Sequence, residues 1–217
     1  MDNSMHLLGL SEQLREKYSL ISKKSYNCIV FCGPSGVGKT MAIDHLAKVY
    51  NYVAAPFITT RELRDEETKT QSKSVGYQKF MQMKLNNELF LCAQNYGNSY
   101  GYLIDDVCEF LKNDSVVILE SPASQLLTDI RILLPHSLVF GFIMFDHSIS
   151  KKMLSSRGDT SEIAMRIRGL QCSIESFNIM LAREKMTLEI ITPEYNAPQK
   201  TIEQIVKGVT KHLTLYT

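Results

Sequence analysis

The chain has 217 residues, 44% of them hydrophobic and 22% charged, and its formal net charge is +1. That length suits one well-buried α/β domain, and the near-neutral charge excludes an overall attraction to nucleic acid or to a membrane surface. No apolar run approaches the roughly 20 residues of a membrane span, and the N-terminus lacks the basic start and apolar core of a signal peptide. We therefore expect a cytoplasmic protein that binds neither nucleic acid nor membrane.

The cysteines and histidines point to no disulfide or metal site. The five cysteines are odd in number and include no C-x-x-C pair, and the five histidines are scattered without metal-ligand spacing. Cys28 and Cys32 are four residues apart on a predicted strand and therefore share one of its faces. We expect buried free thiols in a reducing compartment at all five positions, which are Cys28, Cys32, Cys92, Cys108 and Cys172.

The first predicted element is an amphipathic helix. Residues 6–21 carry leucines, Tyr18 and Ile21 among charged residues, at the spacing of a helix with one apolar face. That face would pack either on the body of the protein or on a second copy of the chain, which would make a homodimer through this helix. Residues 1–25 are thus predicted to form an N-terminal helical extension.

A strand, a glycine-rich loop and a helix are predicted next, over residues 26–32, 33–40 and 41–50. The loop reads Gly33-Pro34-Ser35-Gly36-Val37-Gly38-Lys39-Thr40 and fits G-x-x-x-x-G-K-[ST], the phosphate-binding P-loop. Its glycines let successive backbone N–H groups curl around one anion, and the positive end of the helix adds to the same site. Lys39 would reach the β- and γ-phosphates of a nucleoside triphosphate, and the Thr40 hydroxyl can ligate Mg²⁺. A chance glycine-rich turn is the alternative, which the strand before and the helix after disfavour.

The middle of the chain predicts a small inserted subdomain. Residues 52–58 are predicted to form a second strand, followed by a polar stretch over 59–74 and a helix over 80–87. Two short strands over 89–94 and 100–102 flank a turn at Gly97-Asn98. Residues 58–102 are therefore predicted as a mixed subdomain outside the main sheet.

An alternation of helices and strands then resumes. Helices are predicted over 104–112, 124–134, 149–156, 161–185 and 200–213, and strands over 115–120, 138–145 and 187–191. Such alternation predicts a parallel sheet covered by helices on both faces, the three-layer α/β/α fold of P-loop NTPases. Ligands in these folds bind beyond the carboxyl ends of the strands, where the P-loop lies.

These motifs together resemble the guanylate kinases, a family of P-loop nucleoside monophosphate kinases, over roughly residues 26–213. The P-loop sequence is close to that of the family. The family's T-T-R-x-x-R segment is resembled by Thr59-Thr60-Arg61-Glu62-Leu63-Arg64. Gly76-Tyr77, Asn87-Glu88-Leu89-Phe90 and Gly97-Asn98-Ser99-Tyr100-Gly101 follow in the family's order. The resemblance implies a domain over 26–217, with an acceptor-binding subdomain over 58–102 and a helical lid over 157–170.

The resemblance also implies a reaction, in which MgATP donates its γ-phosphate to a phosphorylated small molecule. Four residues would hold the acceptor's phosphate: Arg61, Arg64, Tyr77 and Tyr100. The residue types agree, because two guanidinium forks and two phenol hydroxyls suit a phosphomonoester. The alternative is that the arginines pair with neighbouring acids at positions 62 and 65–67.

The base-reading positions depart from the family. Leu91 stands where guanylate kinases read guanine with a Glu, and Tyr102 stands where a Ser or Thr touches the base. Tyr102 and Glu120 remain candidates for contacting the acceptor. The leading acceptor is a nucleoside monophosphate, GMP or dGMP. The ribose 1,5-bisphosphate phosphokinases show similar departures but usually lack the second arginine, which is present here as Arg64.

The predicted lid supplies positive charge to the transferring phosphoryl group. Arg157 and Arg166 resemble the family's lid arginines and would act with Lys39 as the catalytic residues. Met153 occupies another lid-arginine position, for which Lys151, Lys152 or Arg168 are candidate substitutes, and a solvated helix face is the alternative reading. A guanylate-kinase-like binding module without activity is a further hypothesis. Such modules usually have eroded P-loops, so the intact Lys39 and Thr40 disfavour it.

Overall fold

The computed structural model describes residues 10–33, 37–63, 72–95, 97–121, 127–142, 187–194 and 197–215. The main sheet in this part of the chain has five strands in the order β2-β7-β1-β8-β9. Its pairings are all parallel. The strands are β1 (Cys28–Cys32), β2 (Val53–Ala54), β7 (Val117–Ser121), β8 (Leu138–Phe142) and β9 (Thr187–Ile191). The predicted parallel sheet is confirmed.

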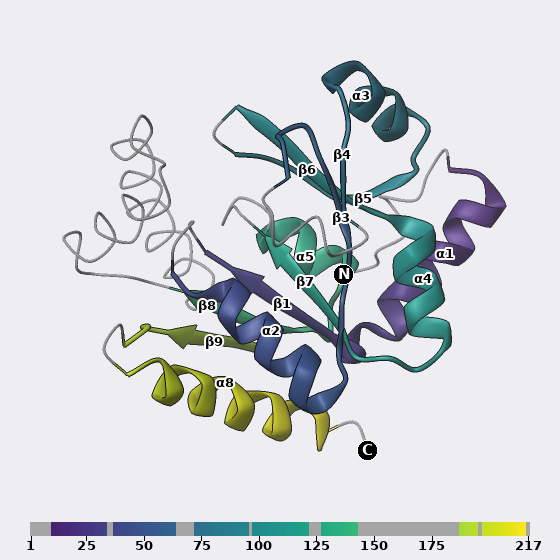
Figure 1. The fold of residues 1–217 in the computed structure, drawn as a ribbon. Coiled ribbons are helices and arrows are strands. Elements are labelled where there is room, and N and C mark those ends of the chain that lie inside the picture. Colours follow the sequence, from purple (N-terminus) through teal and green to yellow (C-terminus); the bar gives the residue numbers. More distant parts are fainter. Residues whose placement is uncertain are drawn as a thin grey trace.

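Helices cover both faces of this sheet (Figure 1). On one face lie α2 (Lys39–Tyr50) and α8 (Pro198–Leu213), whose apolar residues share a core with Ile29 and Phe31 of β1. On the other face lie α1 (Glu12–Lys23), α4 (Ile104–Lys112) and α5 (Leu127–Leu133). Cys28, Val30 and Cys32 of β1 point to that second core. The alternation of side chains along one buried strand thus builds the three layers.

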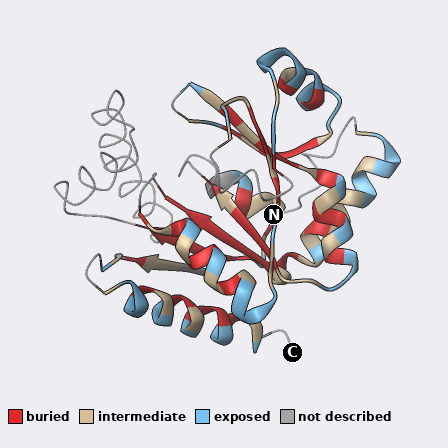
Figure 2. Cartoon of the chain, viewed as in Figure 1, coloured by how far each residue is buried: buried red, intermediate tan, exposed pale blue. Residues whose placement is uncertain are grey.

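Burial follows this layering. Every residue of β1 and β8 is buried, and the outward sides of the helices are exposed (Figure 2). Cys28 and Cys32 are free and fully buried, and burial raises the pKa of both thiols to about 12. Cys92 and Cys108 are also free thiols, whereas Cys172 lies outside the described residues.

A second sheet forms the inserted subdomain, with the order β4-β3-β6-β5. Its strands are β3 (Phe57–Thr59), β4 (Lys73–Ser74), β5 (Leu89–Asn95) and β6 (Asn98–Leu103), and α3 (Tyr77–Leu85) packs on it. In Figure 1 this sheet stands above the carboxyl ends of β1 and β7. It therefore faces the edge at which the P-loop lies.

The chain crosses between the two sheets at Pro56. We predicted one strand over 52–58, and this is wrong: β2 ends at Ala54 in the main sheet and β3 begins at Phe57 in the second sheet. Proline has no N–H to donate to a ladder, so the parallel pairing of β2 with β7 stops before it. Continuous apolar character alone did not reveal the break.

Other element boundaries differ by a few residues. A 3₁₀ turn over Ser25–Asn27 precedes β1, and α3 begins three residues before the predicted helix. Helix α1 begins after Ser11, whose hydroxyl accepts a hydrogen bond from the Leu14 N–H. Its apolar side packs on the core of the same chain, through Ile21. The helices predicted over 149–156 and 161–185 lie outside the described residues.

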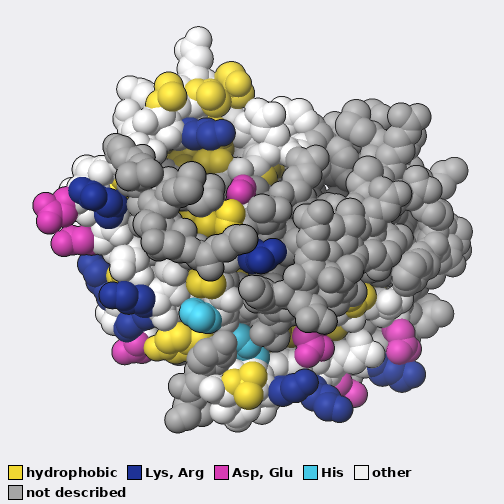
Figure 3. Space-filling model, turned by 180° about the vertical axis from the view of Figure 1, so that it is seen from behind, with side chains coloured by type: hydrophobic (Ala, Val, Ile, Leu, Met, Phe, Trp, Pro, Cys, Tyr) yellow, Lys and Arg dark blue, Asp and Glu magenta, His cyan; other side chains and the backbone are white. Residues whose placement is uncertain are grey.

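Among the described residues, one face of the surface carries charges of both signs. Seen from behind, Lys and Arg side chains interleave with Asp and Glu along the left and lower edges (Figure 3). Within the described residues, no helix is long and apolar enough to cross a bilayer, and no cluster of three metal-binding side chains occurs.

Candidate active site

The P-loop begins where β1 ends, at Gly33. This residue has φ +151°, and a Cβ placed on it would lie 2.9 Å from both the Cβ and the carbonyl oxygen of Phe142 in β8. Its N–H donates to the Ser121 carbonyl at 3.4 Å, at the end of β7. Gly33 is therefore required by the close approach of three neighbouring strands as well as by the turn.

The other end of the loop joins α2. Val37 is 2% exposed and anchors the loop in the core between the sheet and α2. Gly38 is the residue before the first helical turn and has φ +92°, a conformation that favours glycine. The unpaired N–H groups of this turn and the helix dipole suit an anion at this point. Pro34, Ser35 and Gly36 lie outside the described residues.

Lys39 lies at the centre of the site. Its side chain is buried, at 4% exposure, although it carries a charge. The ammonium donates to the Gly33 carbonyl at 2.8 Å and lies 3.3 Å from the Glu120 carboxylate. Both acceptors are near the carboxyl ends of adjacent strands, so they hold the cation at the mouth of the loop. Thr40 follows on the first turn of α2 and is exposed, as a hydroxyl that ligates a bound metal would need to be.

A second cationic group lies on the subdomain sheet. The Arg61 guanidinium stands over the rings of Phe57 and Tyr100, 5.8 Å from each centroid. Thr59 and Thr60 shape the turn before it: the Thr59 hydroxyl accepts from the Arg61 N–H at 3.3 Å, and the Thr60 hydroxyl accepts from the Ser99 N–H at 2.8 Å. The structure thus brings Arg61 and Tyr100 together, as the family pattern implied.

The remaining predicted acceptor ligands are placed differently. Tyr77 is the first residue of α3 and is 56% exposed, three residues beyond the end of β4. Arg64 lies outside the described residues, as do Arg157, Arg166 and the rest of the predicted lid. The Arg61 guanidinium donates to the Glu62 carbonyl at 2.7 Å, a bond to the main chain of that neighbour.

The two positions that depart from the family are both buried. Leu91 is 7% exposed, has φ +49°, and lies in an irregular part of β5 where the register to β6 shifts between Phe90 and Ala93. Tyr102 is 5% exposed, and burial raises the pKa of its phenol. Its hydroxyl donates to the Glu120 carbonyl and accepts from the Glu120 N–H, each at 2.7 Å. That hydroxyl thus bonds to the main chain of β7, a contact that the sequence did not reveal.

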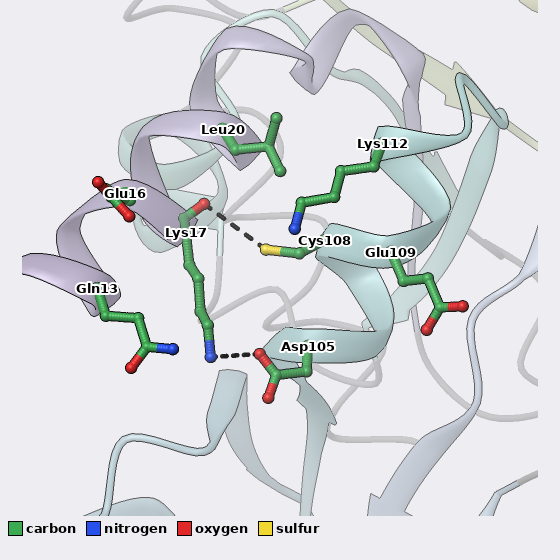
Figure 4. Close-up of a pocket in the computed structure, with 8 residues that line it drawn as sticks. All are labelled: Gln13, Glu16, Lys17, Leu20, Asp105, Cys108, Glu109 and Lys112. Carbon is green, nitrogen blue, oxygen red and sulfur yellow. Dashed lines mark hydrogen bonds and ion pairs between the residues drawn. The ribbon is translucent and has the colours of Figure 1, made fainter.

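A separate cavity of about 600 Å³ lies between α1 and α4 (Figure 4). Lys17 is turned toward Asp105 in an ion pair, and the Cys108 thiol donates to the Lys17 carbonyl at 3.7 Å. The cavity shares no lining residue with the P-loop or with the Arg61 cluster, which is formed by Phe57, Arg61 and Tyr100. It belongs to the packing of the N-terminal helix rather than to the site.

A glycine-rich loop at the carboxyl edge of a parallel sheet, with a buried lysine at the start of the following helix, defines a P-loop α/β protein. A family model described as guanylate kinase matches residues 25–186. The chain belongs to the guanylate kinase family.

Known proteins agree with this assignment. A guanylate kinase of Clostridium acetobutylicum is 37% identical over 101 residues, which are 46% of this chain and 48% of that protein. The matched segment therefore spans about half the length of that curated relative. The crystal structure of a guanylate kinase from Anaplasma phagocytophilum superposes with a TM-score of 0.58 at 16% identity, over 86% of this chain and 85% of that one. This second likeness shows the fold.

Proposed function

We propose that this protein transfers the γ-phosphate of MgATP to a phosphorylated small-molecule acceptor, with GMP or dGMP as the leading acceptor. One observation carries the proposal: one cationic group suited to phosphate begins the helix after the P-loop, and a second follows β3 of the subdomain, whose sheet stands above the carboxyl ends of β1 and β7 (Figure 1). Lys39 is buried at the mouth of the P-loop, and Arg61 lies beside Tyr100 on the subdomain sheet. Two separated phosphate sites are what transfer between a donor and an acceptor phosphate needs.

The donor side would be held by the P-loop. Val37, Gly38 and residues 34–36 would supply backbone N–H groups, and Lys39 would leave the Gly33 carbonyl and Glu120 to contact the phosphates. The exposed Thr40 hydroxyl fits a Mg²⁺ ligand, and Mg²⁺ when bound would neutralise charge on the donor phosphates. Glu120, 3.3 Å from Lys39, would accept hydrogen bonds from water around that metal.

The acceptor side would be held by Arg61 and Tyr100, with Arg64 and Tyr77 as further proposed ligands. A phosphate oxygen that attacks is already ionised, so the reaction needs positioning and charge neutralisation rather than a general base. Arg157 and Arg166 are proposed to add positive charge around the transferring group from the lid. Division into an extension (1–25), a domain (26–217), an acceptor subdomain (58–102) and a lid (157–170) is part of the same proposal.

The identity of the acceptor is tested by a coupled assay of ADP formation. The panel is GMP, dGMP, AMP, CMP, UMP and ribose 1,5-bisphosphate. Buried Leu91 offers no polar group to a base, which supports weaker discrimination among bases than a paired carboxylate would give. We expect turnover with at least one nucleoside monophosphate, GMP or dGMP first. Turnover with ribose 1,5-bisphosphate alone would establish the sugar-phosphate kinase instead.

A binding assay separates the kinase from a binding module without activity. Lys39→Ala removes the buried cation, so MgATP affinity should fall by about 10- to 100-fold, the range for a charge-assisted contact. Lys48→Ala, on the exposed far end of α2, is the matched control and should leave the affinity unchanged. Equal and negligible MgATP binding by the protein and by Lys39→Ala would favour the module.

Two further expectations remain proposals. The four described cysteines are free thiols, which supports a reducing compartment such as the cytoplasm.

A homodimer through α1 would use its charged outer side, because the apolar side already packs within the chain. That outer side begins with Glu12 and ends with Lys23, an order that complements itself when two helices pair antiparallel. Light scattering after size exclusion tests the homodimer. The protein is measured at about 100 µM, on the order of the Kd of a weak interface, and a monomer mass there would contradict the homodimer.

A further inference from the structure

The edge of strand β7 loses its partner strand just before the active site. β2 pairs with this edge through the Val53 N–H to the Val116 carbonyl and the Ala55 N–H to the Ile118 carbonyl, both at 2.9 Å. The next acceptor at the same spacing is the Glu120 carbonyl. By then the chain has turned at Pro56, and the Phe57 N–H is donated to the Ser72 hydroxyl at 3.1 Å. Glu120 therefore sits beyond the end of the β2 ladder.

The Tyr102 hydroxyl takes the place of the missing strand. It donates to the Glu120 carbonyl and accepts from the Glu120 N–H, each at 2.7 Å. A hydroxyl can do both at once, whereas no apolar side chain can do either. Since Tyr102 is 5% exposed, these groups would be left unpaired in a poorly hydrated place if the hydroxyl were removed. One phenol thus fixes both polar groups of one main-chain residue.

That main-chain residue carries the carboxylate that holds the P-loop lysine. Glu120 pairs with Phe31 in the β1–β7 register, and Phe31 is two residues before Gly33 in β1. The Glu120 Oε1 lies 3.3 Å from the Lys39 ammonium. Tyr102 itself lies on β6, two residues from Tyr100, whose ring contacts Arg61. A continuous set of contacts therefore runs from the Arg61 cluster through Tyr102 and Glu120 to Lys39.

We propose that Tyr102 is a positioning residue, which fixes the Glu120 main chain so that the Glu120 carboxylate holds Lys39 at the mouth of the P-loop. In this role it ties the subdomain that carries Arg61 and Tyr100 to the donor-phosphate site. The functional part of this inference rests on the proposed phosphotransfer. The contacts themselves can be tested without any turnover.

The test measures how fast the Lys39 amine reacts with acetic anhydride in the protein without nucleotide, by mass spectrometry of the digested chain. Tyr102→Phe should raise the rate at Lys39 about five-fold, the factor for loss of one ordinary hydrogen bond. Lys48, exposed at the other end of α2, serves as the internal reference and should not change. Tyr18→Phe, which removes a phenol hydroxyl beside the same core, is the matched control and should leave Lys39 protected.

A double-mutant cycle separates positioning from general loosening. Glu120→Gln should itself raise the Lys39 rate, and adding Tyr102→Phe should raise it no further, because Tyr102 acts only through Glu120. An unchanged Lys39 rate in Tyr102→Phe overturns the proposal, and so does an undiminished effect in the Glu120→Gln background. If Tyr102→Phe also raises the rate at Lys48, that variant has loosened the fold generally and the test rests on Glu120→Gln. An unchanged Lys39 rate in Glu120→Gln then overturns the proposal.

A kinetic readout is added once an acceptor is in hand. Tyr102→Phe should lower kcat several-fold, on the order of one lost hydrogen bond. The KM values for MgATP and acceptor should move less than about two-fold, since in this role Tyr102 touches neither ligand. A rise in acceptor KM at unchanged kcat would show instead that Tyr102 contacts the acceptor. Absence of turnover with every acceptor would contradict the proposed function and leave the labelling result standing.

Discussion

Replacement of Arg61 by alanine tests the assignment of the acceptor site. The guanidinium stands over two rings at 5.8 Å and donates to the Glu62 carbonyl at 2.7 Å. Hydrogen bonds to a charged group are worth about 1.5–3 kcal/mol, so loss of the phosphate contact should raise acceptor KM about 10- to 150-fold. Loss of the two ring contacts should lower the free energy of unfolding by only about 1–2 kcal/mol.

The assay for Arg61→Ala uses initial rates at saturating MgATP with the acceptor varied, and calorimetry for MgATP binding. Arg61→Lys keeps the charge but loses the planar fork, and should give an intermediate KM. Arg15→Ala, on the exposed side of α1, should behave like the unchanged protein. The reasoning is refuted if MgATP affinity falls by this factor while acceptor KM stays constant, because Arg61 would then serve the donor.

Two further perturbations test the loop and the core. Gly33→Ala would place a methyl group 2.9 Å from Phe142, at a cost of roughly 1–3 kcal/mol for overpacking, and should weaken MgATP binding at least about ten-fold. Gly97→Ala, also at positive φ but with no described atom within 4 Å of the added Cβ, should leave MgATP binding unchanged, and an equal loss in both variants would argue against the close-approach explanation. Burial lowers the pKa of His212 below its ordinary value of 6.5, against the opposing effect of its bond to the Tyr26 carbonyl. The unfolded chain therefore binds this proton more readily, and stability should fall as pH drops below about 6.5. Urea unfolding at about pH 7.5 and about pH 5.5 should show a smaller loss for His212→Gln, and equal losses would show that His212 does not contribute.

Much of the fold could be predicted from local patterns. The helix over 104–112 and the strand over 187–191 have the predicted bounds, because two acidic residues open the helix and Pro193 lies just beyond the strand. The loop before α2 could be recognised because its spacing has one established structural meaning. These predictions rest on residues close together in sequence.

The parts that sequence could not show depend on contacts between distant segments. An apolar run over 52–58 reads as one strand, and only the two sheets reveal that Pro56 divides it. Leu91 adopts φ +49° because the register of β5 shifts beside it, which no residue pattern announces. The two bonds from the Tyr102 hydroxyl to Glu120 could not be predicted either, since nothing in the sequence shows that the departure of β2 leaves the Glu120 main chain for that hydroxyl to bind.

The central claim is that a phosphoryl group moves from MgATP, held at Lys39, to an acceptor held at Arg61. Phosphorus NMR of the protein with MgATP and GMP tests it most directly, because it identifies both products in one sample. We predict ADP and GDP in equal amounts, and neither from Lys39→Ala under the same conditions. Hydrolysis of MgATP to ADP and inorganic phosphate with no nucleoside diphosphate from any monophosphate, or equal product from Lys39→Ala, would contradict the claim.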